Sequence, residues 1–228
     1  MARQVFTKLI TPIGSAVWPK LITPDTKFKA GGEYTCKLAL EPDAASDMIA
    51  LLEKALDNYI ENFKADPDNS SKIRKFYEKD GVTPVRRAAV YTEEYDADDK
   101  ATGRLIFNFK RPASYLDKKT DNQRPMRPPT LFDSQGTIIK GLEDLWGGSR
   151  LSIAGHIRPY AMESTQQFGL SLRVDAVQVI ELSDGILKTA DSFGFGKQEG
   201  GFEASDSPFV SPEAEAVGPE EDDGADDF

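Results

Sequence analysis

The side chains that could serve as nucleophiles or soft metal ligands are scarce in this sequence of 228 residues. His156 is its single histidine and Cys36 its single cysteine. A zinc cluster therefore lacks parts, and a Cys–His nucleophile pair or a Ser-His-Asp triad would depend on these single residues. His156 lies inside LSIAGHIR, a predicted strand, where a surface position is the expected role. A lone cysteine also excludes an intramolecular disulfide and fits a reducing compartment.

Two other patterns could suggest catalysis, and neither has the necessary spacing. The acidic run EEYDADD, residues 93–99, could hold the two metals of a nuclease, but contiguous carboxylates between strands are more typical of a solvated loop. The glycines of AGGEYTCK and FGFGK do not match the GxxxxGK spacing of a phosphate-binding loop and indicate turns. We expect no catalytic residue, no metal and no cofactor.

Residues 104–127 combine positive charge with aromatic rings. Seven basic residues are interleaved there with Phe107, Phe109 and Tyr115. A positive groove that follows phosphates, with rings that stack on bases, is what sequence-tolerant binding of single strands requires. Phe107 and Phe109 share a strand face with Leu105, so their periodicity favours the core, with DNA contact as the alternative. Tyr115 follows Pro112 in a basic loop and is expected to face solvent or ligand.

Two more aromatic residues stand beside cations. Trp18 precedes Pro19 and Lys20, and Tyr160 follows Arg158. Proline interrupts strand pairing, which leaves the neighbouring ring near a rim. The candidate DNA-binding residues are Trp18, Lys20, Arg86, Phe107, Phe109, Lys110, Arg111, Tyr115, Lys118, Lys119, Arg124, Arg127, Arg150, Arg158 and Tyr160.

The elements that must position these residues are mostly strands. Alternating patterns predict strands at 33–40, 86–92, 103–111, 150–158 and 168–182, and apolar residues three and four apart predict one helix at about 43–65. Strand and helix do not alternate, which argues against a parallel α/β sheet. The sequence indicates a mainly β domain, a small barrel or sandwich with one long helical insertion.

Charge divides the chain into a body and a tail. Of the 38 acidic residues, 11 lie in residues 198–228, which contain no Lys or Arg, so the body carries 27 acidic residues against 28 basic ones. We expect a folded domain at 1–197 and a disordered acidic tail at 198–228. No segment reads as a signal peptide or a membrane span, so a protein of the cell interior is expected.

Several segments, in order along the chain, resemble the single-stranded DNA-binding proteins of T7-type phages. The resemblance is carried by ASYLDKKT (113–120), LFDSQGTII (131–139), WGGSRLSI (146–153), IRPY (157–160), LSLRVDAVQVIEL (170–182) and an acidic tail ending in Phe. It implies an OB-fold five-stranded barrel that binds single-stranded DNA with little sequence preference and promotes annealing. It also implies a homodimer acting in phage DNA replication, recombination and repair, in the cytoplasm of the infected bacterial host.

The tail has its own expected roles. Its carboxylates resemble a phosphate backbone, so it could occupy the basic groove until DNA displaces it. The resemblance implies that the freed tail contacts the replicative DNA polymerase and helicase-primase, with partner-binding residues Asp222, Asp223, Asp226, Asp227 and Phe228. A merely solubilising tail is the simpler alternative. The competing functions are a DNA-mimic or adaptor protein whose tail binds a host DNA-processing enzyme, and a nuclease using residues 93–99.

Overall fold

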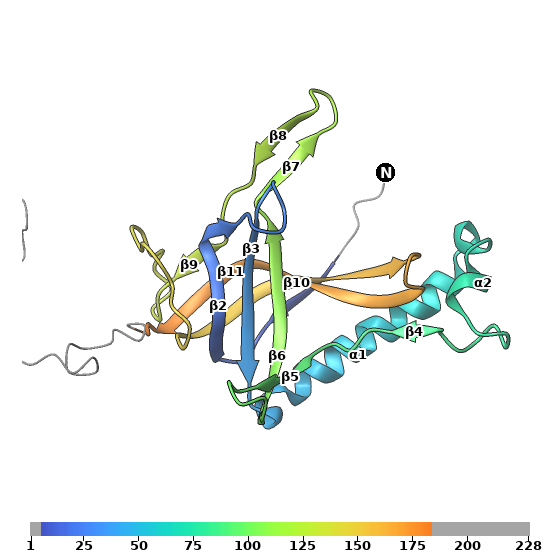
Figure 1. The fold of residues 1–228 in the computed structure, drawn as a ribbon, viewed down its shortest axis with the longest axis horizontal. Coiled ribbons are helices and arrows are strands. Elements are labelled where there is room, and N and C mark those ends of the chain that lie inside the picture. Colours follow the sequence, from blue (N-terminus) through green and yellow to red (C-terminus); the bar gives the residue numbers. More distant parts are fainter. Residues whose placement is uncertain (1–5, 184–228) are drawn as a thin grey trace, which may run out of the picture. The chain divides into compact units, whose positions relative to one another are not determined.

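The computed structural model describes residues 6–183 of the chain (Figure 1). The expected domain edge near Lys197 and the tail, residues 198–228, lie outside the described residues. Within residues 6–183 no helix is long and apolar enough to cross a membrane.

Five strands pair in a ring: β2 (Gly14–Asp25), β3 (Glu33–Leu40), β6 (Ala101–Pro112), β10 (Arg150–Met162) and β11 (Gln167–Glu181). β3 pairs antiparallel with both β2 and β6, and β10 pairs antiparallel with β11 along its length. Two short seams complete the ring, because β2 meets β10 through two residue pairs and β6 runs parallel to β11 through two more. This arrangement is the expected OB fold, a five-stranded barrel that stays partly open along its seams.

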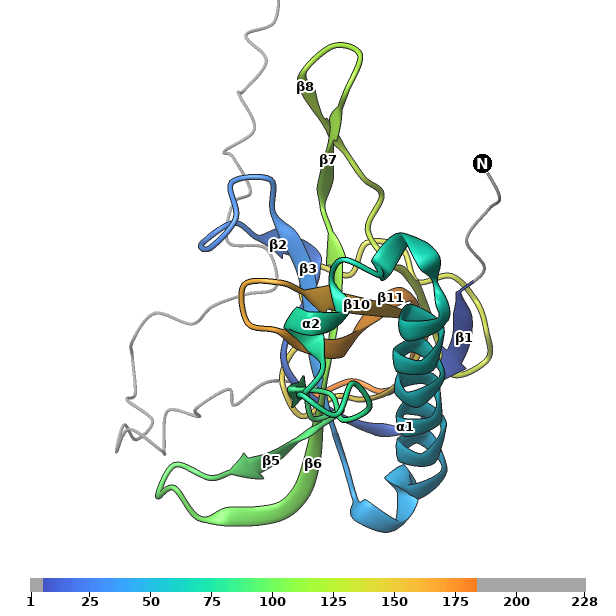
Figure 2. The same ribbon diagram turned by 90° about the vertical axis from the view of Figure 1, so that its right-hand side faces the viewer.

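The expected long helix is confirmed as α1 (Pro42–Ala65), which lies in the chain between β3 and β6. Its buried residues recur at helical spacing along one face: Ala45, Met48, Leu52, Leu56, Ile60 and Phe63. The first part of this face packs on the barrel core, and the last part packs with Phe76, Tyr77 and Phe168 in a second cluster. The Tyr77 hydroxyl donates a hydrogen bond of 2.7 Å to the carbonyl of Ile60. Figure 2 shows α1 running beside the barrel, where it contacts β10 and β11.

The remaining elements are short and peripheral. They are β1 (Thr7–Ile10), the 3₁₀ helix η1 (Pro67–Asn69), α2 (Ile73–Phe76), β4 (Arg86–Arg87), β5 (Thr92–Tyr95), β7 (Ser114–Asp117), β8 (Asn122–Pro125) and β9 (Thr130–Phe132). β1 extends the sheet beyond β10, and β5 pairs with β6. β7 and β8 form a separate hairpin that projects beyond the barrel (Figure 1).

Two strand predictions need correction. Residues 86–92 do not form one strand, because only Arg86 and Arg87 pair with β11 before the chain leaves the sheet. The first barrel strand, β2, was missed, since Pro19 and Pro24 within it cannot donate to a ladder. A bulge accommodates Pro19: Val17 faces Lys37 and Lys20 faces Thr35, so β2 carries one extra residue there.

Candidate nucleic-acid interface

A row of directly paired residues crosses the outer face of the barrel. Reading from β2 through β3, β6 and β11 to β10, the partners are Lys20, Thr35, Lys110, Arg173 and His156. Residues directly opposite one another on paired strands point to the same side of a sheet. Apart from Arg111, the sequence neighbours of this row are buried, so the row itself faces outward and carries three permanent cations, Lys20, Lys110 and Arg173.

Three hollows follow this face and share residues, so they form one continuous path. The first, of about 630 Å³, is lined by Trp18, Lys20, Arg104 and Trp146 among others. The second, of about 520 Å³, shares Trp18 and Lys20 with the first and adds Lys37 and Lys110. The third, of about 300 Å³, shares Lys110 with the second and adds Arg158, Tyr160 and Arg173. We call this path the basic track.

The cations of the track are only weakly compensated. Within residues 6–183, Lys20, Lys37, Lys110, Arg158 and Arg173 form no ion pair. Partial burial, and then the positive charge of Arg158, lower the pKa of Arg173. A surface where cations are both crowded and partly desolvated is stabilised by an approaching polyanion, whose phosphates replace the missing counter-charges.

Five of the expected binding residues lie together in the track: Trp18, Lys20, Lys110, Arg158 and Tyr160. Their spacing in the sequence is wide, and the pairing of the strands brings them together. Trp18 is 80% exposed at the β2 bulge, as its place before Pro19 suggested. Tyr160 is paired with Gly169 across the β10–β11 ladder, so its ring lies over a residue without a side chain.

Phe107 and Phe109 are a correction to the expected DNA contacts. Both belong to the core, with 0% and 1% of their surface exposed. They face Leu38 and Cys36 on β3, on the inner side of the barrel. A ring in this position offers no open face to a base. The core position that their strand periodicity favoured is therefore the one that the structure shows.

A second group of expected residues lies on the β7–β8 hairpin. Tyr115 is 51% exposed and faces Arg124 across the hairpin. The Nε of Arg124 donates a hydrogen bond of 2.8 Å to Asp117, while Lys118 and Lys119 occupy the turn. The hairpin lines none of the three hollows, so these residues are near neighbours of one another and form a separate basic arm.

The other expected cations are dispersed. Arg86 lies on β4 at the end of β11, and Arg150 begins β10 beside β2; neither lines the track. Arg111 is paired with Asp175 at 3.4 Å, and Asp175 is also 2.7 Å from the ring of His156. Together with Arg127 and the three cations of the hairpin, seven of the candidate cations therefore do not line the track.

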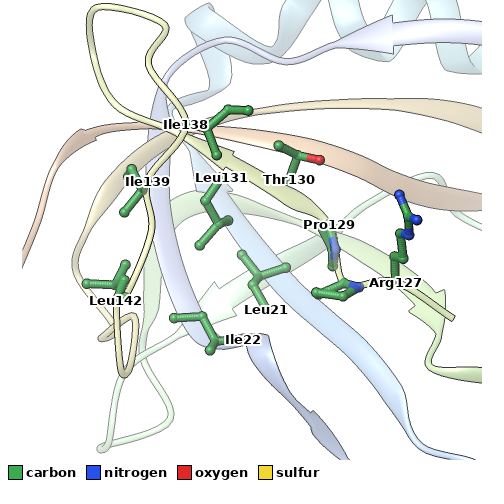
Figure 3. A pocket seen from close by; sticks show the side chains of 11 residues that line it. Leu21, Ile22, Arg127, Pro129, Thr130, Leu131, Ile138, Ile139 and Leu142 are labelled. Carbon is green, nitrogen blue, oxygen red and sulfur yellow. The ribbon is translucent and has the colours of Figure 1, made fainter. Parts of the chain in front are cut away.

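Arg127 borders a different pocket, which is mainly apolar. This pocket of about 330 Å³ is lined by Leu21, Ile22, Leu131, Ile138, Ile139 and Leu142 among others. Figure 3 shows the guanidinium of Arg127 to one side of these apolar side chains. The pocket shares no lining residue with the basic track, so Arg127 does not extend it.

Besides Arg104, which is paired with Glu94, three track residues were missed from the sequence: Lys37, Trp146 and Arg173. A usable signal existed for the two cations, because each lies between buried residues of an alternating strand and must point outward. Trp146 is 54% exposed in a loop and is followed by Gly147 and Gly148. Its role depends on where that loop lies, which the sequence does not indicate.

The groups considered for catalysis have structural roles. Arg104 donates two hydrogen bonds to the carboxylate of Glu94, at 2.6 and 2.8 Å. The Asp96 carboxylate accepts the backbone N–H groups of Asp98 and Lys100, which closes a turn. Cys36 is buried in the barrel, and burial raises the pKa of its thiol to about 12. Within residues 6–183 no group of three potential ligands could hold a metal ion.

An OB barrel whose outer face carries weakly compensated cations and exposed rings defines a class, the nucleic-acid-binding OB-fold proteins. The family model described as "Single-stranded DNA-binding protein, Bacteriophage T7" matches residues 16–182. The chain belongs to this family, as the sequence resemblance predicted. The family is one of non-catalytic binding proteins, in agreement with the expectation of no enzyme activity.

Individual relatives are distant. A single-stranded DNA-binding protein of Enterobacteria phage T3 is 26% identical over 161 residues, which are 71% of this chain and 64% of the relative. That of Escherichia phage T7 is 23% identical over 165 residues, 72% of this chain and 62% of the relative. The chain thus spans less than two thirds of these curated relatives. The crystal structure of gp2.5, a single-stranded DNA binding protein encoded by bacteriophage T7, matches with TM-score 0.56 at 22% identity, covering 88% of this chain and 100% of that chain, and supports the fold.

Proposed function

We propose that this protein binds single-stranded DNA along the basic track, without catalysis and with little sequence preference. The observation that carries the proposal is the continuity of the track across the outer face of the barrel. Cations spaced along a path contact successive phosphates of any sequence. Membership of the family supports the same ligand.

The position of the rings favours a single strand over a duplex. Trp18 and Trp146 lie at one end of the track and Tyr160 near the other. A ring can stack on a base only where that base is not already stacked between its own neighbours in a duplex. Every base has such a face, which explains binding without a preferred sequence.

A titration with a labelled oligothymidylate tests this function. We expect binding that is tighter than to a duplex of equal length and that weakens as salt rises. Lys110→Ala should weaken binding and reduce the salt slope by about 0.7 for one lost phosphate contact. Lys54→Ala is the matched control, because Lys54 is an exposed lysine of α1 that lines none of the hollows. Equal effects of the two substitutions would contradict the assignment of the track.

We further propose that the protein acts as a homodimer in phage DNA replication, recombination and repair, in the cytoplasm of the infected host. These roles follow from the family resemblance and extend it to this chain. Sedimentation of the purified protein measures the subunit number. The replication role is tested with a phage from which this protein has been deleted. We expect that such a phage does not copy its DNA.

The segment that ends at Phe228 is our proposed contact to the replicative DNA polymerase and helicase-primase. Asp222, Asp223, Asp226 and Asp227 supply charge, and Phe228 supplies an aromatic anchor for an apolar pocket in the partner. Deletion of Phe228 alone retains every tail carboxylate. It should therefore preserve DNA affinity and lower affinity for the polymerase, which a pull-down with both forms would show.

A further inference from the structure

The first hollow of the basic track contains both tryptophans of the chain. Trp18 and Trp146 are the only two in the sequence, they are 128 positions apart, and both line this hollow. Their residues are 80% and 54% exposed. Within residues 6–183 neither ring packs against another aromatic ring. Two large indoles thus meet solvent at one place, although each alone is among the most costly side chains to leave exposed.

Backbone hydrogen bonds join the two segments that carry these rings. Trp18 has φ +49°, the left-handed region that a bulky residue rarely adopts, at the bulge of β2. The Gly148 N–H donates 2.8 Å to the carbonyl of Ala16, and the Ala16 N–H donates 2.8 Å to the carbonyl of Ser149. Leu145, only 2% exposed, anchors the same loop in the core. These contacts join the loop of Trp146 to the strand of Trp18, and strained backbone of this kind is concentrated at ligand sites.

The lining of the hollow selects a base over a phosphate. Asp144 lines it and would repel a phosphate placed inside, and the charge of Arg104, which also lines it, is already paired with Glu94. Lys20 belongs to this hollow and to the next one along the track, where it can meet a phosphate outside. The volume of about 630 Å³ lies within the usual range of small-ligand pockets, about 300–1,000 Å³.

We propose that the hollow between Trp18 and Trp146 is a binding site for an unstacked nucleobase of single-stranded DNA, with Lys20 on the adjoining phosphate. The proposal rests on the proposed function, since it names the site where one end of the track takes hold of a base. It adds Trp146 and its glycine loop to the binding residues. The indole faces supply stacking that every base can use.

Tryptophan fluorescence tests the site directly, because every tryptophan of the chain lies in it. We would titrate the full chain, and the variants Trp18→Phe and Trp146→Phe, with oligothymidylate. Each variant keeps one tryptophan and one flat ring. We expect quenching in all three proteins, because each indole stacks on a base. An abasic oligonucleotide of equal length has the same charge without bases, and it should bind with little quenching.

Affinity supplies the second readout. Trp146→Ala should lower affinity for oligothymidylate about tenfold, the scale of one lost base stack. Tyr95→Ala is the matched control, because Tyr95 is 57% exposed on the acidic β5 segment and lines none of the track hollows. Unchanged melting temperature would show that both variants are folded.

The outcomes separate the site from the function. Normal affinity of Trp146→Ala, or equal quenching by the abasic strand, would overturn the nucleobase site while DNA binding by the track stands. Absence of oligothymidylate binding by the wild-type chain, with residues 198–228 present or removed, would overturn both. Quenching of both single-tryptophan variants together with the tenfold loss would support the site.

Discussion

Arg173 is a partly buried cation beside another cation, Arg158, and it faces Lys110 across a pair of strands. Burial first, and the charge of Arg158 second, lower its pKa, which means that the free protein tolerates this charge at a cost. The carboxylate of Glu33 offsets the charge only in part, and among residues 6–183 Arg173 forms no ion pair. Because Arg173 lowers the stability of the free protein and lies in the basic track, we expect its charge to contact a DNA phosphate.

The first prediction follows for Arg173→Gln. Removal of the charge should raise the melting temperature of the free protein and weaken DNA binding, with a shallower salt dependence. Arg74→Gln is the control, because Arg74 lies on α2 outside the track. Thermal denaturation and oligonucleotide titration of both variants measure the two effects. A loss of stability in Arg173→Gln would contradict the account of its environment.

The second prediction concerns Trp18. Its φ of +49° is easily adopted by glycine and is unfavourable for other residues, by about 1–2 kcal/mol. Because the side chain is 80% exposed, its removal costs little buried surface. Trp18→Gly should therefore match or exceed the wild-type free energy of unfolding while it binds DNA more weakly. Urea denaturation gives the first quantity; stability below that of Trp18→Ala would contradict strain at this residue.

At the scale of elements, α1 supports the barrel and lies outside the basic track. Its buried face joins the barrel core to the second cluster around Phe168, and its described residues line none of the track hollows. The helix therefore stabilises the fold from the side, and the basic track is formed by strands and by the loop at residues 144–148. Substitutions in the buried face of α1 should therefore lower the free energy of unfolding without lowering the affinity for DNA.

The third prediction uses two leucines of this helix. Leu56 is fully buried, whereas Leu51 is 38% exposed on the same helix. Leu56→Ala should lower the free energy of unfolding by about 2–5 kcal/mol, because it leaves a cavity, and Leu51→Ala should change it far less. Chemical denaturation measures both. At temperatures where Leu56→Ala remains folded, oligonucleotide affinity should equal that of wild type; a matching loss of affinity would place α1 in the site.

The elements that the sequence predicted well are those that bury one clear face. α1, β3, β10 and β11 each show their own period over many residues, so their existence and type could be read directly. β2 could not, because its two prolines are tolerated only by a bulge and an irregular ladder. Residues 86–92 have the sequence pattern of a strand, but β11 pairs with only two of them.

The site was only partly predictable for a related reason. Strand periodicity favoured the core for Phe109, and the proline after Trp18 favoured a rim position, but only the structure shows which face of the barrel each ring occupies. Cations at outward strand positions, such as Arg173, were readable in principle. The partnership of Trp18 with Trp146 depends on a loop that returns to β2, which no local pattern reports.

At the scale of the whole molecule, charge is divided very unevenly. Residues 198–228 hold 11 acidic residues and no basic one, while the rest of the chain is close to neutral and carries the basic track. We expect this segment to compete with DNA for the track.

The fourth prediction is that deletion of residues 198–228 tightens binding to single-stranded DNA. A second form, with the 11 carboxylates changed to the corresponding amides, keeps the length and removes the charge. Both forms should bind more tightly than wild type, and by similar factors, if charge is the cause. Titration at moderate salt is the measurement. Unchanged affinity in the amide form would leave the segment without a competitive role.

The seam between β6 and β11 gives a bound strand a mechanical effect. Two residue pairs join β6 and β11, and one of them is Lys110 with Arg173, whose like charges repel each other. A phosphate chain along the track would screen this repulsion and span both strands, as a noncovalent cross-link at one of the two short seams of the barrel. Local opening should then become rarer, and deuterium exchange should slow more at this seam than in the long β10–β11 ladder. A protein that coats DNA in this way would be stiffened by the strand that it covers.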